Sequence, residues 1–238
     1  MKIILNILRL FGEKYSAKLN NIIVNNNDTL KFIRNKEKID IIDVGVYHGT
    51  DFLIENFPNS THYLFEPNTE CNSHIKKNYS HLKYKLFNIG LSDTNKTEKL
   101  SINRSGSSIH EHSNLSPLAG IKFPKKKIQI KKFDNFMSLK KNRQYFLKID
   151  TEGHELSVIK GAKKNLKKID YVLTETRIIP TFKKSNNTFE KIYDEMKLNG
   201  FKLALVSEVG FPDNKVYNYL DILWIKKKLY ESFINNLV

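Results

Sequence analysis

Short apolar runs alternate with amphipathic stretches along the chain between about residues 39 and 225. A run of roughly four to eight apolar residues is typical of a buried strand, whereas apolar residues three or four positions apart are typical of a helix face. The runs predict seven strands, at about 39–44, 62–66, 83–89, 145–150, 171–175, 201–206 and 219–225. Because the strands alternate with helices, we expect an α/β fold with a mostly parallel sheet and helices on both faces.

The stretches between these runs predict the helices. We expect one helix at about 69–78 and another at about 153–167. Asn187 and Glu190 have the spacing of a capping box, and Gly200 is typical of the position just after a helix. A third helix is therefore expected to start at Asn187 and to end at Gly200.

Two segments fall outside this alternation. Residues 1–34 carry short amphipathic patterns, and we expect an N-terminal helical cap packed on the sheet edge. Contact with a membrane or a lid over a substrate is the alternative for this cap. Residues 103–127 are rich in Gly, Ser, His, Pro and Lys, so we expect an inserted loop over the functional site of a main domain at 35–238.

The composition narrows the class of protein. A chain of 238 residues, 40% apolar and 27% charged, is long enough for a sizeable core and has a soluble balance. The single cysteine, Cys71, argues against a disulfide framework or a cysteine-rich zinc site. No apolar run approaches the roughly 18–20 residues of a membrane-spanning helix. We therefore expect a cytoplasmic protein.

The formal net charge of +15 raises nucleic acid and anionic surfaces as partners. Most of the basic residues are lysines scattered over predicted helix faces, without an array of arginine and aromatic residues. We therefore interpret the charge mainly as a solvated surface. Nucleic acid is not the expected partner, while peripheral contact with an anionic membrane stays open.

The first predicted strand leads into the pattern Asp43-x-Gly45-x-x-x-Gly49. Glycines between a strand and a helix let backbone N–H groups approach a ligand closely. Glu66 ends the next strand, 23 residues after Asp43, where an acid can accept hydrogen bonds from both ribose hydroxyls of a nucleoside. The pattern lacks the G-x-G-x-x-G of dinucleotide enzymes and resembles motif I of the S-adenosylmethionine-dependent methyltransferases. It therefore predicts a methyl-donor site.

In sheets of this type, ligands bind outside the carboxyl ends of the strands, beside the first strand. The residues at those ends are therefore the candidates for the functional site. They are Asp43, Gly45, Gly49, Glu66, Asn88, Asp150 and Glu175.

The string Asp-Thr-Glu-Gly-His-Glu after the fourth strand holds three carboxylates and an imidazole. Such a cluster could supply a general base, a metal site or a favourable helix start. We favour Asp150 for positioning of donor or substrate and for proton removal, with His154 and Glu175 as further catalytic candidates. Glu152 and Glu155 could simply favour the helix N-terminus. Asp150, Glu152 and Glu175 could also hold a metal ion, but their spacing is not diagnostic, and we assign no metal ligand.

Several short motifs occur in an order that resembles the FkbM-type methyltransferase family over roughly residues 38–226. The string from Lys148 to Glu155, with Lys160-Gly161-Ala162 downstream, makes the resemblance specific. The other motifs are Ile42-Asp43-Val44-Gly45, Phe65-Glu66-Pro67-Asn68, Gly90-Leu91-Ser92-Asp93, Ser107-Ser108 and Thr174-Glu175.

The resemblance implies a class I, Rossmann-like methyltransferase fold: a doubly wound seven-stranded, mostly parallel sheet with an antiparallel last strand. It also implies S-adenosyl-L-methionine as methyl donor and O-methylation of a hydroxyl group. By position, Asp43, Gly45 and Gly49 would bind the methionine part of the donor. Glu66 would bind its ribose, and the turn that starts at Asn88 its adenine.

Three functions remain open at this stage. The leading hypothesis is an O-methyltransferase for a hydroxyl of a carbohydrate, a glycoconjugate or a related small metabolite. The aromatic-proline loop of base N-methyltransferases is replaced here by Asp-Thr-Glu-Gly. RNA ribose 2′-O-methylation is the alternative, with a loose basic and acidic set of Lys148, Asp150, Arg177 and Glu208. A non-catalytic donor-binding domain is the third.

Overall fold

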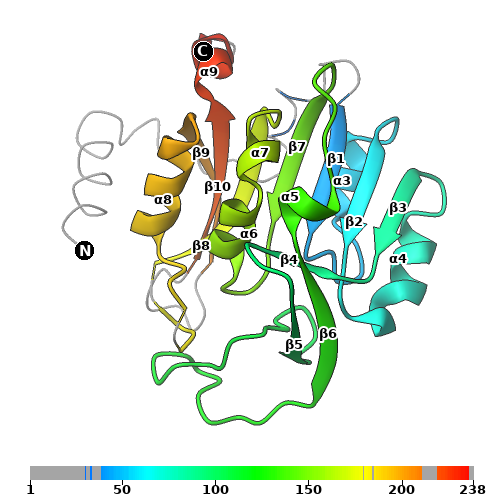
Figure 1. Ribbon diagram of the computed structural model, residues 1–238, viewed down its shortest axis with the longest axis vertical. Helices are drawn as coiled ribbons and strands as arrows, with labels where there is room; N and C mark the ends of the chain where they lie inside the picture. The colour runs from blue at the N-terminus through cyan, green and yellow to red at the C-terminus, as the bar shows by residue number, and fades with distance from the viewer. Residues whose placement is uncertain are drawn as a thin grey trace.

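The computed structural model describes most of the chain from Ile39 onward (Figure 1). The described residues are 30, 33, 39–178, 180–183, 185–210 and 219–235, without the side chains of 207–210. The helical cap predicted at 1–34 therefore lies outside the described residues, apart from Leu30 and Ile33. These two side chains are buried in an apolar cluster with residues of the sheet.

A seven-stranded sheet forms the centre of the fold, with the strand order β3-β2-β1-β7-β8-β10-β9. Its strands are β1 Ile39–Val44, β2 Thr61–Phe65, β3 Lys83–Phe87, β7 Gln144–Ile149, β8 Tyr171–Arg177, β9 Phe201–Gly210 and β10 Tyr219–Lys226. The pairs from β3 to β8 are parallel, whereas β10 is antiparallel to both β8 and β9. This confirms the predicted doubly wound sheet with its antiparallel last strand.

The chain leaves β1 in one direction through β2 and β3, and it returns to the other side of β1 with β7 and β8. The boundary between β1 and β7 is therefore the switch point at which doubly wound sheets bind ligands. β1 and β7 are paired from Ile39 with Gln144 to Val44 with Ile149. This register brings the glycine loop after β1 directly beside the acidic string after β7.

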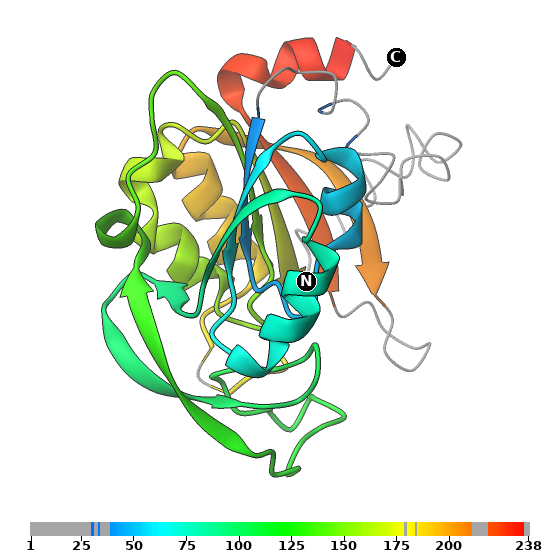
Figure 2. The same cartoon turned by 90° about the vertical axis from the view of Figure 1, so that its right-hand side faces the viewer.

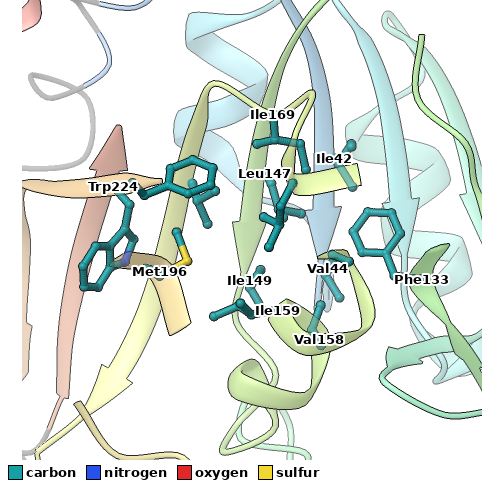
Figure 3. Packing of buried hydrophobic residues seen from close by; sticks show 14 of the residues in the cluster. Ile42, Val44, Phe133, Leu147, Ile149, Val158, Ile159, Ile169, Met196 and Trp224 are labelled. Atoms are coloured by element: carbon teal, nitrogen blue, oxygen red, sulfur yellow. The ribbon is translucent and has the colours of Figure 1, made fainter. Parts of the chain in front are cut away.

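Helices cover both faces of the sheet, with α5–α8 on one side and α3 and α4 on the other (Figure 2). They are α3 Asp51–Asn56, the 3-10 helix η1 Thr69–Cys71, α4 Asn72–Asn78, α5 Phe133–Phe136, α6 Glu155–Gly161, α7 Lys163–Leu166, α8 Phe189–Leu198 and α9 Lys227–Asn235. Alternate residues of each strand face opposite sides, so that Ile42 and Leu147 pack against α6 and α8 (Figure 3). Ile41 and Phe146 belong to the cluster on the other face.

The helix predicted at 153–167 begins two residues later and is divided in two. Glu152 and Gly153 have φ angles of 51° and 96°, in the left-handed region, so they cannot be part of a right-handed helix. The helix therefore starts at Glu155, and Ala162 separates α6 from α7.

The predicted capping box at Asn187 is wrong. Helix α8 begins at Phe189, and Thr188 precedes it without a side-chain capping bond. The Asn187 side chain bonds the first turn of α6 instead: Nδ2 donates to Glu155 Oε2, and Oδ1 accepts from the backbone N–H of Leu156 at 2.8 Å.

A second sheet of three strands was not predicted, and it lies below the main sheet in Figure 1. Its strands are β4 Gly90–Ser92, β5 Lys96–Ser101 and β6 Lys125–Lys132. The inserted loop expected at 103–127 is therefore shorter and connects β5 to β6. Ile128 and Ile130 alternate with polar residues and are buried, which is the period-two signal that would have revealed β6.

Across the described part of the chain, no helix combines the length and the apolar character that crossing a bilayer requires.

Candidate active site

A cavity of about 480 Å³ lies outside the carboxyl ends of the central strands. The volume falls within the range of roughly 300–1,000 Å³ that is typical of small-molecule and cofactor sites. Its walls include these residues predicted for the functional site: Gly45, Gly49, Glu66, Asp150, His154 and Glu175. Asp43 and Asn88 were also predicted, but they lie outside the cavity lining.

Gly45 brings the loop after β1 against the loop after β7. A Cβ atom at Gly45 would lie 1.7 Å from the carbonyl oxygen of Asp150, so no other residue fits at this backbone position. The φ angle of +86° also favours glycine, and Gly45 N donates to Phe65 O at 3.0 Å. The first glycine of the pattern is thus explained by close contact of two loops beneath the cavity.

Asp43 supports this loop from below. The side chain is fully buried, and Oδ2 accepts from Thr50 Oγ1 at 2.7 Å. Its Oδ1 lies 3.4 Å from Lys148 Nζ. The contacts favour a role for Asp43 in ordering the loop, while the predicted contact with the donor itself stays a prediction.

Lys148 joins the two loops at the switch point. Its ammonium group lies 3.3 Å from Asp150 Oδ2 and 3.1 Å from the carbonyl oxygen of Gly45. Burial alone lowers the pKa of Lys148, but the neighbouring carboxylates of Asp43 and Asp150 outweigh it and raise the pKa above its ordinary value. Lys148 is therefore a permanently charged link in the floor of the site.

Glu66 is buried at the end of β2, with 7% of its surface exposed. Its Oε2 accepts from Tyr47 N and its Oε1 from Asn68 N, both at 2.8 Å. Burial raises the pKa of Glu66, although these backbone hydrogen bonds draw it down. Each carboxylate oxygen can accept a further hydrogen bond, so the geometry is compatible with the predicted ribose contact.

Asn88 supports Glu66 from outside the cavity. Its Nδ2 donates to the carbonyl oxygen of Glu66 at 2.9 Å, and its amide also exchanges hydrogen bonds with Asn72. The side chain is exposed. A direct contact of Asn88 with the donor therefore stays a prediction.

Three carboxylates meet opposite the glycine loop. One oxygen from each of Asp150, Glu152 and Glu175 lies within 4.8 Å of the others, close enough to hold a metal ion. Arg177 already places a cation there: its Nη2 is 2.9 Å from Glu175 Oε1 and hydrogen-bonds Glu152 Oε2. From the sequence we considered Arg177 only for the alternative of RNA methylation, and its place in this cluster was not predicted.

The two glutamates of this cluster hold their protons more tightly than usual. Burial raises the pKa of Glu152 to about 7, with Asp150 adding to the rise and Arg177 opposing it. Burial and the neighbouring Asp150 and Glu152 also raise the pKa of Glu175 well above its ordinary value. Carboxyl groups tuned toward neutral pH in a cavity wall are candidates for general bases.

Glu155 organises the loop that carries these acids. Its Oε1 accepts from Thr151 N at 2.7 Å, from Thr151 Oγ1 at 3.0 Å and from Gly153 N at 3.2 Å. Asn187 donates to the other oxygen. Glu155 thus folds the Asp-Thr-Glu-Gly turn and holds Glu152 in its left-handed conformation.

His154 lines the cavity with both ring nitrogens engaged. Nε2 lies 2.9 Å from Ser92 Oγ, and Nδ1 lies 3.2 Å from His110 Nε2. Burial, with His110 and Lys96 adding to it, lowers the pKa of His154 to about 3. So weak a base is poorly suited to remove a proton, and the geometry favours the carboxylates; a catalytic role for His154 stays a prediction.

The second sheet and the β5–β6 loop close the cavity from the side opposite β1. The apolar residues Leu100, Ile128 and Ile130 line it, and the loop adds Arg104 and Ser107. The sequence motif Ser107-Ser108 falls in this wall. Ser108 Oγ donates to the carbonyl oxygen of Glu152 at 2.7 Å, which fastens the wall to the acidic turn.

The strand order, the antiparallel β10 and a cavity beside the glycine loop define a class I methyltransferase with a Rossmann-like fold. The chain belongs to the methyltransferase FkbM domain family, whose model matches residues 43–203. The matched part of the chain is therefore an S-adenosylmethionine-dependent methyltransferase domain.

Solved structures share this fold at low sequence identity. A methyltransferase FkbM from Methylobacillus flagellatus KT has a TM-score of 0.50 and 13% identity, over 79% of this chain and 43% of that chain. The chain thus spans less than half of that protein. Magnesium protoporphyrin IX methyltransferase from Synechocystis PCC 6803, with bound S-adenosylmethionine, has a TM-score of 0.46 and 10% identity, over 93% of this chain and 96% of that chain. A comparison with curated proteins gives no match.

The residues of the cavity fit S-adenosylmethionine as the methyl donor. Gly45 and Gly49 leave backbone exposed in the lining, and Glu66 keeps acceptor capacity at the end of β2. Asp150 places a carboxylate in the same cavity, which suits a sulfonium cation.

Proposed function

We propose that the protein methylates a hydroxyl group of a carbohydrate, a glycoconjugate or a related small metabolite. The observation that carries the proposal is the cluster of Asp150, Glu152 and Glu175 in the wall of the donor cavity. An alcohol must lose a proton as it is methylated, and a carboxylate with a raised pKa can take it near neutral pH. Free sugars and membrane-linked glycan precursors both offer such hydroxyl groups.

When bound, the donor supplies a methyl group whose carbon–sulfur bond breaks as the acceptor oxygen bonds to the carbon. Catalysis then depends largely on positioning and on a base for the hydroxyl proton. Glu175 and Glu152 face the cavity and share Arg177, which stabilises their ionised forms. We assign removal of the hydroxyl proton to one of these two carboxylates. Lys148 and Asp150 would orient the groups of the site.

RNA ribose methylation has less support. Lys148 is buried and held by Asp43 and Asp150, and Arg177 is paired with Glu152 and Glu175. Neither cation is thus presented to a phosphate backbone. The side chain of Glu208, the fourth residue of that set, lies outside the described residues. A non-catalytic donor-binding domain would not require the cluster of Asp150, Glu152 and Glu175 in the wall of the donor cavity.

Transfer of a radioactive methyl group from S-adenosylmethionine tests the proposal directly. The acceptors are sugar nucleotides, a surface-glycan extract and total RNA, compared at equal enzyme concentration. We expect label in a sugar-containing acceptor and none in RNA. Label in RNA alone would contradict the proposal, and donor binding without transfer to any acceptor would favour the non-catalytic domain. A cytoplasmic location belongs to the same proposal, because the donor and sugar nucleotides would be supplied there.

A further inference from the structure

A second cavity, of about 380 Å³, lies between the β5–β6 loop and the segment after β8. Its lining holds three lysines and one carboxylate, whereas acidic residues outnumber basic ones in the lining of the donor cavity. Lys122 and Lys125 come from the end of the loop and the start of β6, and Lys183 comes from the opposite side. His110 and His112 also line it, each with one ring nitrogen already engaged: His110 Nε2 lies 3.2 Å from His154 Nδ1, and His112 Nδ1 lies 3.0 Å from Ser116 Oγ.

The charges of this second cavity are arranged around one carboxylate. Glu111 Oε1 lies 3.7 Å from Lys125 Nζ, and Glu111 Oε2 lies 3.8 Å from Lys183 Nζ. Both distances are longer than a hydrogen bond. Glu111 therefore lies between two lysines whose ammonium groups keep N–H donors for a ligand. Burial lowers the pKa of His110 and of His112, which leaves both rings neutral at pH 7. Three lysines against one glutamate then make the cavity cationic.

The two cavities share a wall. Along residues 105–110 successive residues line one cavity and then the other, in a segment folded by turns in which Gly106 N donates to Asn103 O at 2.8 Å. Ser105, Ser107 and Ile109 line the donor cavity, whereas Gly106, Ser108 and His110 line the second one. The cationic cavity is thus separated from the donor cavity by one thickness of chain.

Backbone contacts hold the far side of the second cavity in place. Lys183 N donates to Glu111 O at 2.7 Å, and Ser113 N donates to Thr181 O at 2.8 Å. Phe182 lies between them, forms an isolated bridge with His112 and packs under Arg177, whose Cζ is 5.1 Å from its ring. The segment that carries Lys183 is therefore tied both to the loop and to the acidic cluster.

We propose that the second cavity binds a phosphate or diphosphate group of the acceptor, while the acceptor hydroxyl reaches the donor cavity past the shared wall. This inference rests on the proposed O-methylation and names the chemistry of its acceptor. Lysine is a suitable ligand for phosphate because its ammonium acts as a compact point charge with three donors. A sugar hydroxyl alone offers little charge for recognition, and an attached phosphate supplies it.

Calorimetric titration with inorganic pyrophosphate tests the cavity without requiring methyl transfer. The test variant is Lys122→Gln/Lys183→Gln, and the matched control is Lys160→Gln/Lys197→Gln, which removes two exposed lysines on α6 and α8. We expect the test variant to bind pyrophosphate about tenfold more weakly than the wild type, and the control to bind within about twofold of it. Both variants should bind S-adenosylhomocysteine as the wild type does.

Two results would overturn the inference. One is that the wild-type protein fails to bind pyrophosphate at low salt. The other is that the control loses as much affinity as the test variant, because binding would then reflect net charge alone. Failure of the acceptor screen together with intact, Lys183-dependent pyrophosphate binding would instead count against the proposed methylation and leave the anion site standing.

Two further ligands distinguish the source of the phosphate. Uridine diphosphate presents it in solution, and phosphatidylcholine vesicles with phosphatidic acid present it on a lipid surface. If uridine diphosphate displaces pyrophosphate more effectively, the acceptor is of the soluble sugar-nucleotide kind. If the vesicles do so, it is lipid-linked. Either displacement supports the anion site, provided that it is lost in Lys122→Gln/Lys183→Gln.

Discussion

At the scale of single residues, Glu66 has two roles, and a single substitution would remove both. It accepts hydrogen bonds from Tyr47 N and Asn68 N, and it is the predicted partner of the donor ribose. We expect Glu66→Ala to weaken binding of S-adenosylhomocysteine at least about tenfold, because a buried hydrogen-bonding charge is lost. Calorimetry measures this directly. The exposed Glu190→Ala serves as the control, and an unchanged affinity in Glu66→Ala would remove Glu66 from the donor site.

The glutamates that face the donor cavity predict the pH dependence of catalysis. The pKa of Glu152 is raised to about 7, so the carboxylate form grows as the pH rises through that value. We therefore expect kcat/KM to increase with pH and to level off above about pH 8. A rate that falls over the same interval would contradict a carboxylate base.

Substitution of Glu175, one of the two proposed bases, separates a catalytic role from a structural one. Glu175→Gln should lower kcat by about 10²- to 10⁴-fold and leave binding of S-adenosylhomocysteine unchanged. The pH limb should shift or disappear in the same variant. If kcat is unaffected, the proton leaves through another group, and Glu152 becomes the next candidate.

His154 predicts a pH dependence of stability. Its pKa is about 3 in the folded protein and about 6.5 when unfolded, so the unfolded state binds more protons between these values. Stability is therefore lost as the pH falls below about 6.5, with a slope of about 1.4 kcal/mol per pH unit from this group. In urea titrations at pH 4 to 6, His154→Asn should show a shallower decline than the exposed His81→Asn. Equal slopes would mean that His154 is accessible to protons.

At the scale of elements, Gly161 explains why the Lys-Gly-Ala motif follows the acidic string. A Cβ atom there would lie 1.8 Å from the carbonyl oxygen of Ser92, so α6 can approach β4 only with glycine. Alanine normally stabilises a helix relative to glycine by about 0.5–1 kcal/mol. We expect Gly161→Ala to destabilise the protein instead, by about 1–3 kcal/mol, because backbone must move. Chemical denaturation measures it, with Lys160→Ala as control, and a stabilised Gly161→Ala would contradict the close approach.

The elements also show what the sequence could reveal. β1 and β7 were predicted almost to the residue because runs such as Ile39–Val44 are buried on both faces. β5 and β6 were missed, since lysines on the exposed face of β6 resemble a loop and the strand is buried on one side only. Asn187 was misjudged because its partner, Glu155, is 32 residues away in sequence. Contacts between distant loops leave no local pattern.

The same limit applies to the functional site. Gly45, Glu66 and Asp150 were found because they share one rule, the carboxyl end of a parallel strand. The role of Arg177 was missed because its partner Glu152 is distant in the sequence, and no local sequence pattern predicts this ion pair.

At the scale of the whole molecule, the donor cavity couples ligand binding to the stability of the entire fold. Its walls come from β1, β2, β7, β8 and the second sheet, so they are lost together on unfolding. S-adenosylhomocysteine at about 100 times its Kd should add about 2.7 kcal/mol to the free energy of unfolding. This corresponds to a rise in Tm of about 5–10 °C for a chain of this size. Thermal melts test it, and a Tm that does not respond despite calorimetric binding would place the ligand outside these walls.

The wall between the cavities also constrains how the chain can vary in length. Side chains from 105 to 110 are assigned to one cavity or the other by their odd or even position. Turns hold these assignments in place, because Gly106 N donates to Asn103 O at 2.8 Å and Ser107 Oγ donates to the carbonyl oxygen of Arg104 at 2.8 Å. An inserted residue would break these contacts, so a change of length in this segment would alter the lining of both cavities at once.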